Sequence, residues 1–372
     1  MFRLIYVSIL GLVMALAAIL ASADDEAFTA NFTTPATKIA STVPGNGDQN
    51  PYGVAVVQRS TGKLVQGHIL VSNFNNNGAN GGQQGTGTTI MDIAPDGKTK
   101  VFATISAENL PGACPGGVGL TTALVVLSKG WVIVGSLPTV DGTAATAQAG
   151  CLIVLNSRGH VVETLSGGAI NGPWDMTSVE NDGLAELFVT NVLNGTVKAS
   201  GKAVNSGTVL RIILLVPDDG PPRELLRTVI GSGFAERTDP AALVIGPTGL
   251  GLGCDGTLYV ADTLGNRIAA IHDAVLRFTS AGTGKTVSVG NGLNGPLGLA
   301  IAPNCNILTV NSGDGNLVEL TPHGFQFTPI TIDTTANAPP GNAGTLFGLA
   351  VAPGGKGIYF VDDGDNTLNL LH

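Results

Sequence analysis

The chain has 372 residues, of which 53 are glycine and only 12% are charged, and its formal net charge is −9 at pH 7. The scarcity of Lys and Arg excludes a nucleic-acid partner, because phosphate backbones are bound by clustered basic side chains. Abundant glycine with few charges disfavours long solvated helices and favours short strands joined by tight turns.

The chain begins with a predicted secretory signal peptide, residues 1–23. Arg3 supplies a positive charge, residues 4–20 are apolar, and residues 21–23 read Ala-Ser-Ala. This order predicts cleavage after the small residues. The alternative is an uncleaved membrane anchor, because the apolar run approaches the length that spans a bilayer. We favour cleavage and expect a secreted or periplasmic protein with no membrane contact.

The rest of the chain repeats one pattern six times. Each copy reads as a Gly-Leu-Ala-Val type of strand, a Leu-Tyr-Val-x-Asp type of strand, and two further strands joined by a turn. Repetition of a four-stranded unit at this spacing predicts a propeller. We therefore expect an all-β fold, a six-bladed β-propeller of four-stranded antiparallel blades over residues 50–372. The expected blades are roughly 50–110, 112–166, 170–230, 238–290, 293–333 and 344–372.

The clearest copies resemble the NHL-repeat family of propellers. Residues 247–267 match that family's pattern of Pro-x-Gly-Leu, then Gly-x-Leu-Tyr-Val-Ala-Asp, then Asn-Arg. Residues 296–317 and 346–367 follow the same pattern, and Phe-Val-Thr-Asn at 188–191 is similar to the related Tyr-Val-Thr-Asn repeats. The resemblance implies the fold but no activity, because such scaffolds carry binding proteins, lactonase-type hydrolases and lyases.

The sixth copy supplies only three strands before the chain ends at His372. A ring left in this state would expose an unpaired strand edge. The segment that precedes the first copy, residues 24–49, contains the sequence Thr-Pro-Ala-Thr-Lys-Ile-Ala-Ser at 34–41. We expect residues 34–41 to form the missing outer strand and to join the two ends of the ring.

Connections in an up-and-down blade alternate between its two faces. The loop before each first strand and the loop after each second strand share one face, which we call the loop face. The residue expected directly after strand two is small and polar in every blade: Asn73, Ser136, Asn191, Asp262, Ser312 and Asp363. Asn171 and Asn294 precede first strands on the same face, and Asp175 replaces the repeat glycine of the third blade.

Three blades carry long connections on the loop face, at residues 73–89, 137–150 and 192–207, whereas blades 4–6 use tight turns there. Long connections gathered on one side are more often functional than needed for folding. We therefore predict a binding surface on blades 1–3. The alternative is that these loops are insertions without a function, which are tolerated because long surface loops destabilise a fold only slightly.

Four cysteines allow three disulfide pairings. Cys114 and Cys151 are expected on the loop face of the second blade, and Cys254 and Cys305 in matching turns on the opposite face. Pairing by face predicts Cys114–Cys151 and Cys254–Cys305, and an exported chain favours disulfides over free thiols. The second bond requires turns of adjacent blades to approach within disulfide range.

Resemblance to lactonase-type propellers implies a metal site. In that branch a divalent metal lies at the mouth of the central channel, held by Glu, Asn and Asp side chains. The best donors here are Asn191, Asp262 and Asp363, with Asn73 and Asn294 behind them, and such oxygen ligands suit a hard cation such as Ca²⁺. The family's Glu is missing from residues 42–58, a loss for which Asp175 could compensate in part.

The sequence leaves two functions open. The first is an exported, monomeric binding or scaffold protein that contacts a protein, glycan or small molecule through the loop face of blades 1–3, with no certain cofactor. The second is a divalent-metal-dependent hydrolase of the lactonase or esterase type. We favour the first, because six positions that are all Asp, Asn or Ser suit turn caps, whereas a metal needs only three or four ligands.

Overall fold

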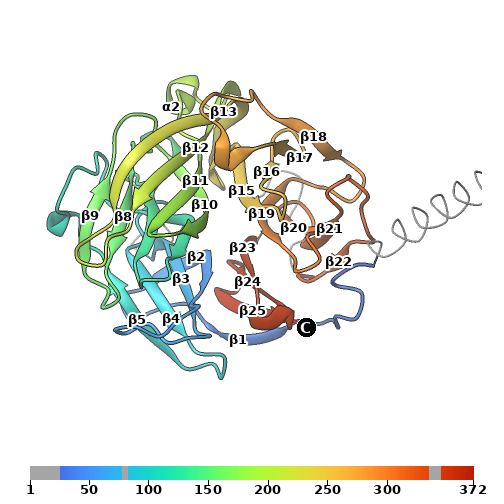
Figure 1. Ribbon diagram of the computed structural model, residues 1–372, viewed down its shortest axis with the longest axis horizontal. Coiled ribbons are helices and arrows are strands. Elements are labelled where there is room, and N and C mark those ends of the chain that lie inside the picture. Colours follow the sequence, from blue (N-terminus) through green and yellow to red (C-terminus); the bar gives the residue numbers. More distant parts are fainter. Residues whose placement is uncertain (1–25, 78–82, 335–344) are drawn as a thin grey trace, which may run out of the picture.

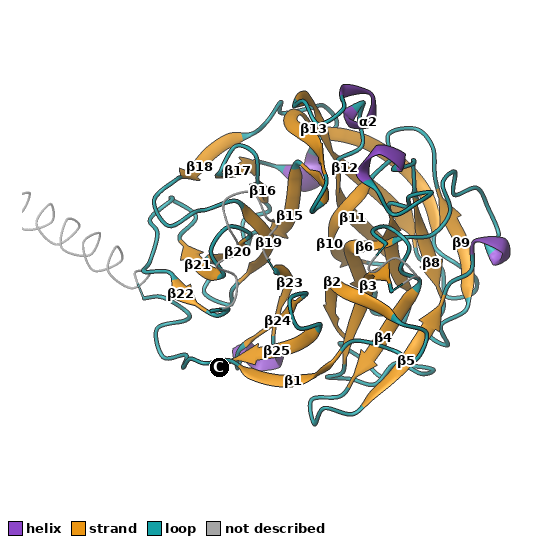
Figure 2. Ribbon diagram, turned by 180° about the vertical axis from the view of Figure 1, so that it is seen from behind, coloured by secondary structure: helices purple, strands orange, loops and turns teal. Residues whose placement is uncertain are grey.

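The computed structural model describes residues 26–77, 83–334 and 345–372. Its strands form six sheets around a central axis (Figure 1), and the view from behind shows few and short helices (Figure 2). The predicted all-β, six-bladed β-propeller is thereby confirmed. The predicted signal peptide, residues 1–23, lies outside the described residues. Within the described part of the chain, no helix has both the length and the apolar character needed to cross a membrane.

The first three blades follow one another in chain order. Blade 1 contains β2 (Asp48–Val56), β3 (Ile69–Asn76), β4 (Thr89–Ile93) and β5 (Thr99–Thr104). Blade 2 contains β6 (Leu120–Val126), β7 (Val132–Ser136), β8 (Cys151–Leu155) and β9 (Val161–Leu165). Blade 3 contains β10 (Pro173–Asn181), β11 (Leu184–Asn191), β12 (Val204–Leu215), β13 (Arg223–Asp239) and the short β14 (Leu243–Ile245).

The other three blades complete the ring. Blade 4 contains β15 (Pro247–Leu252), β16 (Leu258–Asp262), β17 (Arg267–Ile271) and β18 (Lys285–Val289). Blade 5 contains β19 (Pro296–Ile301), β20 (Ile307–Asn311), β21 (Asn316–Leu320) and β22 (Ile330–Thr331). Blade 6 contains β23 (Leu346–Val351), β24 (Ile358–Asp362), β25 (Thr367–Leu371) and β1 (Thr37–Ser41). The helical turns are η1 (Ala107–Asn109), η2 (Ala144–Thr146), α2 (Thr196–Ala199), η3 (Ala274–Leu276) and η4 (Pro353–Gly355).

The hydrophobic core lies between the blades. Middle strands such as β8 and β16 are buried along their whole length. Each blade packs between two others, so both faces of its middle strands need apolar side chains. This is why these strands read as short continuous apolar runs and not as a strict alternation. Apolar clusters join neighbouring blades, for example blade 4 to blade 5 and blade 5 to blade 6.

The six inner strands approach one another closely around the axis. Each inner strand, from β2 to β23, contacts the inner strands of both neighbouring blades. A Cβ added at Gly298 would lie 1.9 Å from the Phe347 carbonyl oxygen, and one at Gly348 would lie 2.2 Å from that of Tyr52. The repeat glycine is therefore required where neighbouring backbones touch. Blade 3 has Asp175 at this position instead.

Blade 3 is larger than the repeat predicts. β12 has 12 residues, β13 has 17, and β13 continues into a fifth strand, with Arg237 opposite Ile245 in β14. The sheet therefore runs past residue 230. Residues 238–245, which the sequence pattern placed at the start of blade 4, belong to the sheet of blade 3.

The N-terminal segment closes the ring, as predicted. β1 pairs antiparallel with β25 as the outer strand of blade 6, with Thr37 opposite Leu370 and Ser41 opposite Thr367. In Figure 1 the blue N-terminal strand β1 lies beside the red C-terminal strand β25. Pairing the first and last parts of the chain satisfies the edge that β25 would otherwise expose.

A second contact anchors the residues before β1. Glu319 of β21, only 2% exposed, accepts hydrogen bonds from the backbone N–H groups of Phe28 (2.6 Å) and Thr29 (2.9 Å). The same carboxylate accepts from Asn306 Nδ2 (2.6 Å), and the rings of Phe28 and Phe32 pack against the core between blades 5 and 6. The N-terminal segment therefore stabilises the last two blades and not only the sheet that it completes.

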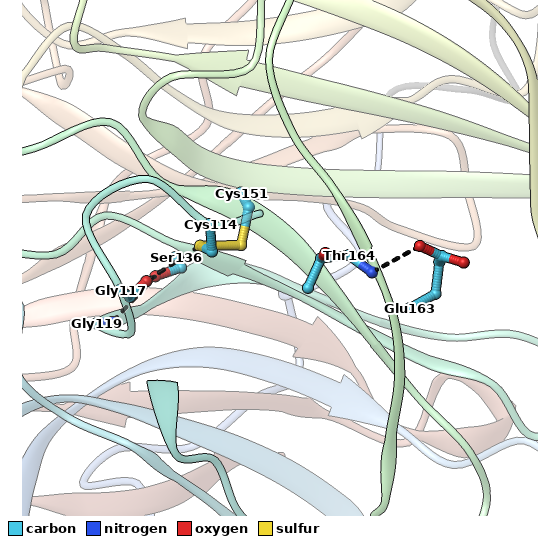
Figure 3. The surroundings of a disulfide bond; sticks show 7 residues. All are labelled: Cys114, Gly117, Gly119, Ser136, Cys151, Glu163 and Thr164. Atoms are coloured by element: carbon cyan, nitrogen blue, oxygen red, sulfur yellow. Dashed lines mark hydrogen bonds between the residues drawn. A yellow bond between two sulfur atoms is a disulfide. The ribbon is translucent and has the colours of Figure 1, made fainter. Parts of the chain in front are cut away.

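Both predicted disulfides are present. Cys114–Cys151, in Figure 3, has a Cα–Cα distance of 5.1 Å and ties the loop before β6 to the start of β8. Cys254–Cys305 has a Cα–Cα distance of 5.8 Å and joins the β15–β16 turn to the β19–β20 turn of the next blade. Two disulfides fit an oxidising, extracellular or periplasmic location.

We predict that Glu319→Ala destabilises the protein by about 3 kcal/mol. The change leaves the buried N–H groups of Phe28 and Thr29 and the amide of Asn306 without their acceptor, and each unsatisfied group costs about 1–3 kcal/mol. Urea unfolding measures the difference, with Glu108→Ala, an exposed residue of η1, as the control. Equal stability of the two variants would show that the N-terminal anchor is dispensable.

Candidate functional site

Large side chains fill the loop-face end of the central channel. They come from the residue before the repeat glycine or its equivalent: Tyr52, Trp174, Leu297 and Phe347, each at most 4% exposed. The ring of Tyr52 stacks on that of Phe347 (3.9 Å between centroids), and Trp174 lies 6.3 Å from Phe347. Trp174 and Phe347 belong to opposite blades, 3 and 6, so their contact closes the channel. We call Tyr52, Trp174, Leu297 and Phe347 the plug.

Long loops of blades 1–3 pack over the plug. We define the loop cap as residues 83–86, 137–150, 192–203 and 240–245. Gln84 Nε2 donates to the Pro240 carbonyl oxygen (2.8 Å), Thr139 Oγ1 to that of Gln84 (2.6 Å), and the Gly201 N–H to Thr238 Oγ1 (3.0 Å). Apolar residues of the cap belong to the same buried cluster as the plug: Leu137, Ala144, Ala147, Val192, Leu243 and Val244. The described parts of the predicted binding loops therefore form one layer, whereas residues 78–82 of the loop 73–89 lie outside the described residues.

The residue that ends strand two differs from the prediction in two blades. Strand pairing sets Pro247 opposite Asp262, Pro296 opposite Asn311 and Leu346 opposite Asp362. The equivalents in blades 5 and 6 are therefore Asn311 and Asp362, and the assignments of Ser312 and Asp363 are wrong by one residue. Two polar residues follow each other in these blades, and a slip of one residue reverses the face of every side chain.

A signal for the right register was present in the sequence. Residues 258–262, 307–311 and 358–362 each read as four mostly apolar residues followed by an Asp or Asn. Alignment on the start of this run, and not on its polar end, selects Asn311 and Asp362.

All six residues in this position bond to nearby backbone, five of them within their own blade and Asn73 to the segment that leads into blade 1, which is the turn-capping role expected for them. Asp262 Oδ1 accepts from the Gly265 N–H (3.1 Å). The other bonds are Asn73 Nδ2 to the Thr42 carbonyl oxygen (2.9 Å), Gly119 N–H to Ser136 Oγ (3.0 Å, Figure 3), Asn171 N–H to Asn191 Oδ1 (3.2 Å), Asn294 N–H to Asn311 Oδ1 (3.1 Å) and Gly364 N–H to Asp362 Oδ1 (2.9 Å).

The other predicted binding-face residues are mostly covered. Asn73 and Asp175 are buried, Asn171 is half-buried, and only Asn294 is exposed. Asp175 lies in the wall of the central channel and not on the loop-face surface. Sequence reasoning placed these residues near the right end of each blade, but their burial depends on the loop cap and the plug.

The three predicted metal ligands do not suit a common cation in this arrangement. Asp262 forms an ion pair with Arg267 (2.8 Å), with side chains 6% and 14% exposed. Burial raises the pKa of Asp363 well above its usual value, and the nearby Asp362 and Asp333 raise it further, which favours the uncharged form. Asn191 is fully buried and bonded to Asn171. In the described residues, no three His, Cys, Asp or Glu side chains gather as a metal would require.

Comparison with known proteins supports the fold. No family model and no curated protein matches the sequence. Among solved structures, the chain is similar to a streptogramin B lyase (TM-score 0.53, 15% identity, covering 93% of this chain and 99% of that one). It is also similar to a gluconolactonase from Xanthomonas campestris (0.52, 13%, 88% and 86%) and to a calcium-binding protein, regucalcin, from Agrobacterium tumefaciens (0.51, 14%, 90% and 95%). At these identities the likeness establishes the propeller fold alone.

We predict that Asp262→Asn destabilises the protein by about 2–3 kcal/mol without changing its calcium content. The amide keeps the bond to Gly265 but leaves the largely buried Arg267 without its counter-charge, which is costly. Urea unfolding and elemental analysis measure the two quantities. Asp365→Asn, which breaks the exposed pair with Lys38, is the control and should cost under about 1 kcal/mol. Loss of bound calcium at unchanged stability would instead identify Asp262 as a metal ligand.

We predict that Asp175 makes the protein less stable as the pH rises from about 4 to about 7. Burial raises the pKa of Asp175 from 3.8 to about 7. Between these pH values the folded protein keeps a proton that the unfolded chain releases, so stability falls with pH. Asp175→Asn should reduce the loss of unfolding free energy between these pH values by up to about 4 kcal/mol. Urea unfolding of both proteins at pH 4.5 and 8 measures it, and parallel pH profiles would contradict the prediction.

Proposed function

We propose that the protein is an exported, monomeric NHL-type propeller without enzymatic activity, whose partner binds the loop face of blades 1–3. The observation that carries this proposal is the loop cap. Its segments come from three different blades and cover one side of one face; residues 83–86 bond to the segments 137–150 and 240–245, and residues 192–203 are held to β13. An ordered surface of this kind loses little conformational entropy when a partner binds.

The base of the cap is braced covalently. Cys114–Cys151 holds the start of β8 against the loop before β6. It therefore fixes the position of the C-terminal end of the connection 137–150. Ser136, at the other end of this connection, donates to the Gly117 carbonyl oxygen (2.9 Å) and accepts from the Gly119 N–H (3.0 Å), as Figure 3 shows. Both ends of the connection are therefore anchored to the same loop.

The turn at residues 140–146 of the loop cap places an exposed apolar side chain beside a negative charge. Val140 is 69% exposed. Beside it, Asp141 Oδ1 accepts from the N–H (3.0 Å) and Oγ1 (2.7 Å) of Thr143, and from Thr146 Oγ1. These bonds lower the pKa of Asp141 and hold the turn in one shape. An apolar tip beside a fixed negative charge suits a partner with an apolar pocket and a basic rim, which we take to be a protein.

The hydrolase alternative has less support. Aromatic and aliphatic side chains of the plug occupy the channel end where the lactonase-type branch is expected to hold its metal. The carboxylate best placed as a ligand, Asp262, already pairs with Arg267. We expect no EDTA-sensitive hydrolysis in a screen of lactones and aryl esters with the purified protein, and such activity would favour the hydrolase.

We predict that a photo-crosslinking residue at position 140 captures a protein partner from the extracellular fraction of cells that produce this protein. The matched control carries the same residue at position 276. Leu276 is similarly exposed, at 72%, but belongs to η3 in the connection between β17 and β18 on the opposite face. We then expect Val140→Asp to weaken the affinity for that partner at least tenfold, or about 1.4 kcal/mol. Capture from position 276 alone, or equally from both positions, would contradict the loop-face proposal.

A further inference from the structure

The central channel continues as a cavity between the plug and the face opposite the loop face. The cavity has a volume of about 360 Å³ and is lined by the inner strands of all six blades. Its lining reaches the last residues of these strands, such as Val56, Val126 and Ile301, and includes none of the plug residues. Since inner strands begin at the loop face, the cavity is closed at that end by the plug and lies towards the opposite face.

The cavity wall combines polar and apolar surface and contains one ionisable side chain. Val54, Leu124, Met176, Leu299 and Leu349 line it on different blades. Asp175 is the one Asp, Glu, Lys, Arg or His among the lining residues. It lies two residues after the start of β10, next to the plug residue Trp174, and therefore near the closed end. The combination is a channel of mixed polarity, with aliphatic side chains from several blades and a carboxyl group at its inner end.

Packing alone does not require a carboxyl group at this position. Blades 5 and 6 have Gly298 and Gly348 here, and their inner strands pack without a side chain. In blade 3, Asp175 Oδ2 accepts a hydrogen bond from the Leu250 N–H (2.9 Å) of the next inner strand, and the backbone N–H of Met176 also bonds to this carboxyl group. A carboxylate has about four acceptor sites, so capacity remains for a donor inside the cavity. Burial raises the pKa of Asp175 to about 7, and no cationic group contributes to this shift.

We propose that this channel binds a small primary amine, whose ammonium group contacts Asp175 while its apolar part extends along the channel towards the opposite face. A carboxylate that is buried without a counter-charge favours a ligand that supplies one. The aliphatic side chains in the wall, such as Val54 and Ala350, favour a hydrocarbon body, and each further methylene buried against them should improve the affinity about threefold to fourfold. This site is separate from the loop cap, so the experiment on it does not depend on whether the loop face binds a partner.

The experiment compares n-hexylamine, 1-hexanol and hexanoate by isothermal titration calorimetry with the mature protein at pH 8. We expect hexylamine to bind with one-to-one stoichiometry and at least tenfold more tightly than hexanol, and hexanoate not to bind. Asp175→Asn keeps an acceptor for the Leu250 N–H and should reduce the preference for the amine to within twofold. Equal affinity for hexylamine and hexanol, or no binding of hexylamine at millimolar concentration, would overturn the proposal.

Two further variants separate the site from general effects. Asp273→Asn removes one negative charge from an exposed turn on the same side of the molecule as the cavity opening, so it controls for attraction by the acidic protein as a whole. Its affinity for hexylamine should match that of the unmodified protein. Ala350→Trp narrows the outer part of the channel, leaves Asp175 unchanged, and should weaken binding at least tenfold. A loss with Asp273→Asn as large as with Asp175→Asn, or full binding by Ala350→Trp, would refute the channel site.

Discussion

The close approach of the six inner strands is the constraint on which the rest of the structure depends. A side chain at Gly298 or Gly348 would overlap the backbone of the next inner strand, so glycine sets the diameter of the ring. A narrow ring brings the residue before each glycine close to the axis. Where that residue is large, as at Tyr52, Trp174 and Phe347, side chains from opposite blades meet and close the channel.

Closure at one end divides the molecule into two regions with different chemistry. On the loop face, the plug supports the loop cap, and the polar residues that end strand two bond to backbone instead of facing an open channel. On the other side of the plug, the channel remains hollow, and Asp175 is the one ionisable residue in its wall. The same glycine position explains this exception, because blade 3 has a carboxyl group where its neighbours have none.

A ring needs its ends joined and its blades held together, and three contacts contribute here. β1 supplies the outer strand of blade 6, Glu319 binds the backbone at Phe28 and Thr29, and Cys254–Cys305 joins blade 4 to blade 5. The first two act between residues about 300 positions apart in the chain, which only a closed ring brings together. Only the β1–β25 pairing lies within one sheet; the bonds of Glu319 and the disulfide Cys254–Cys305 join different parts of the ring.

The sequence by itself determined the six blades, the closing strand at residues 34–41 and both disulfides, because each follows from the repeat and from the alternation of connections between two faces. Alignment on the polar end of strand two placed blades 5 and 6 out of register by one residue, and the structure replaces Ser312 and Asp363 with Asn311 and Asp362, as the start of each apolar run indicates. Only the tertiary structure decided that Asp262 pairs with Arg267, that the loops of blades 1–3 interlock, and that Asp175 faces a cavity. Those outcomes depend on distances across the ring, which all six blades set together and no local pattern of residues records.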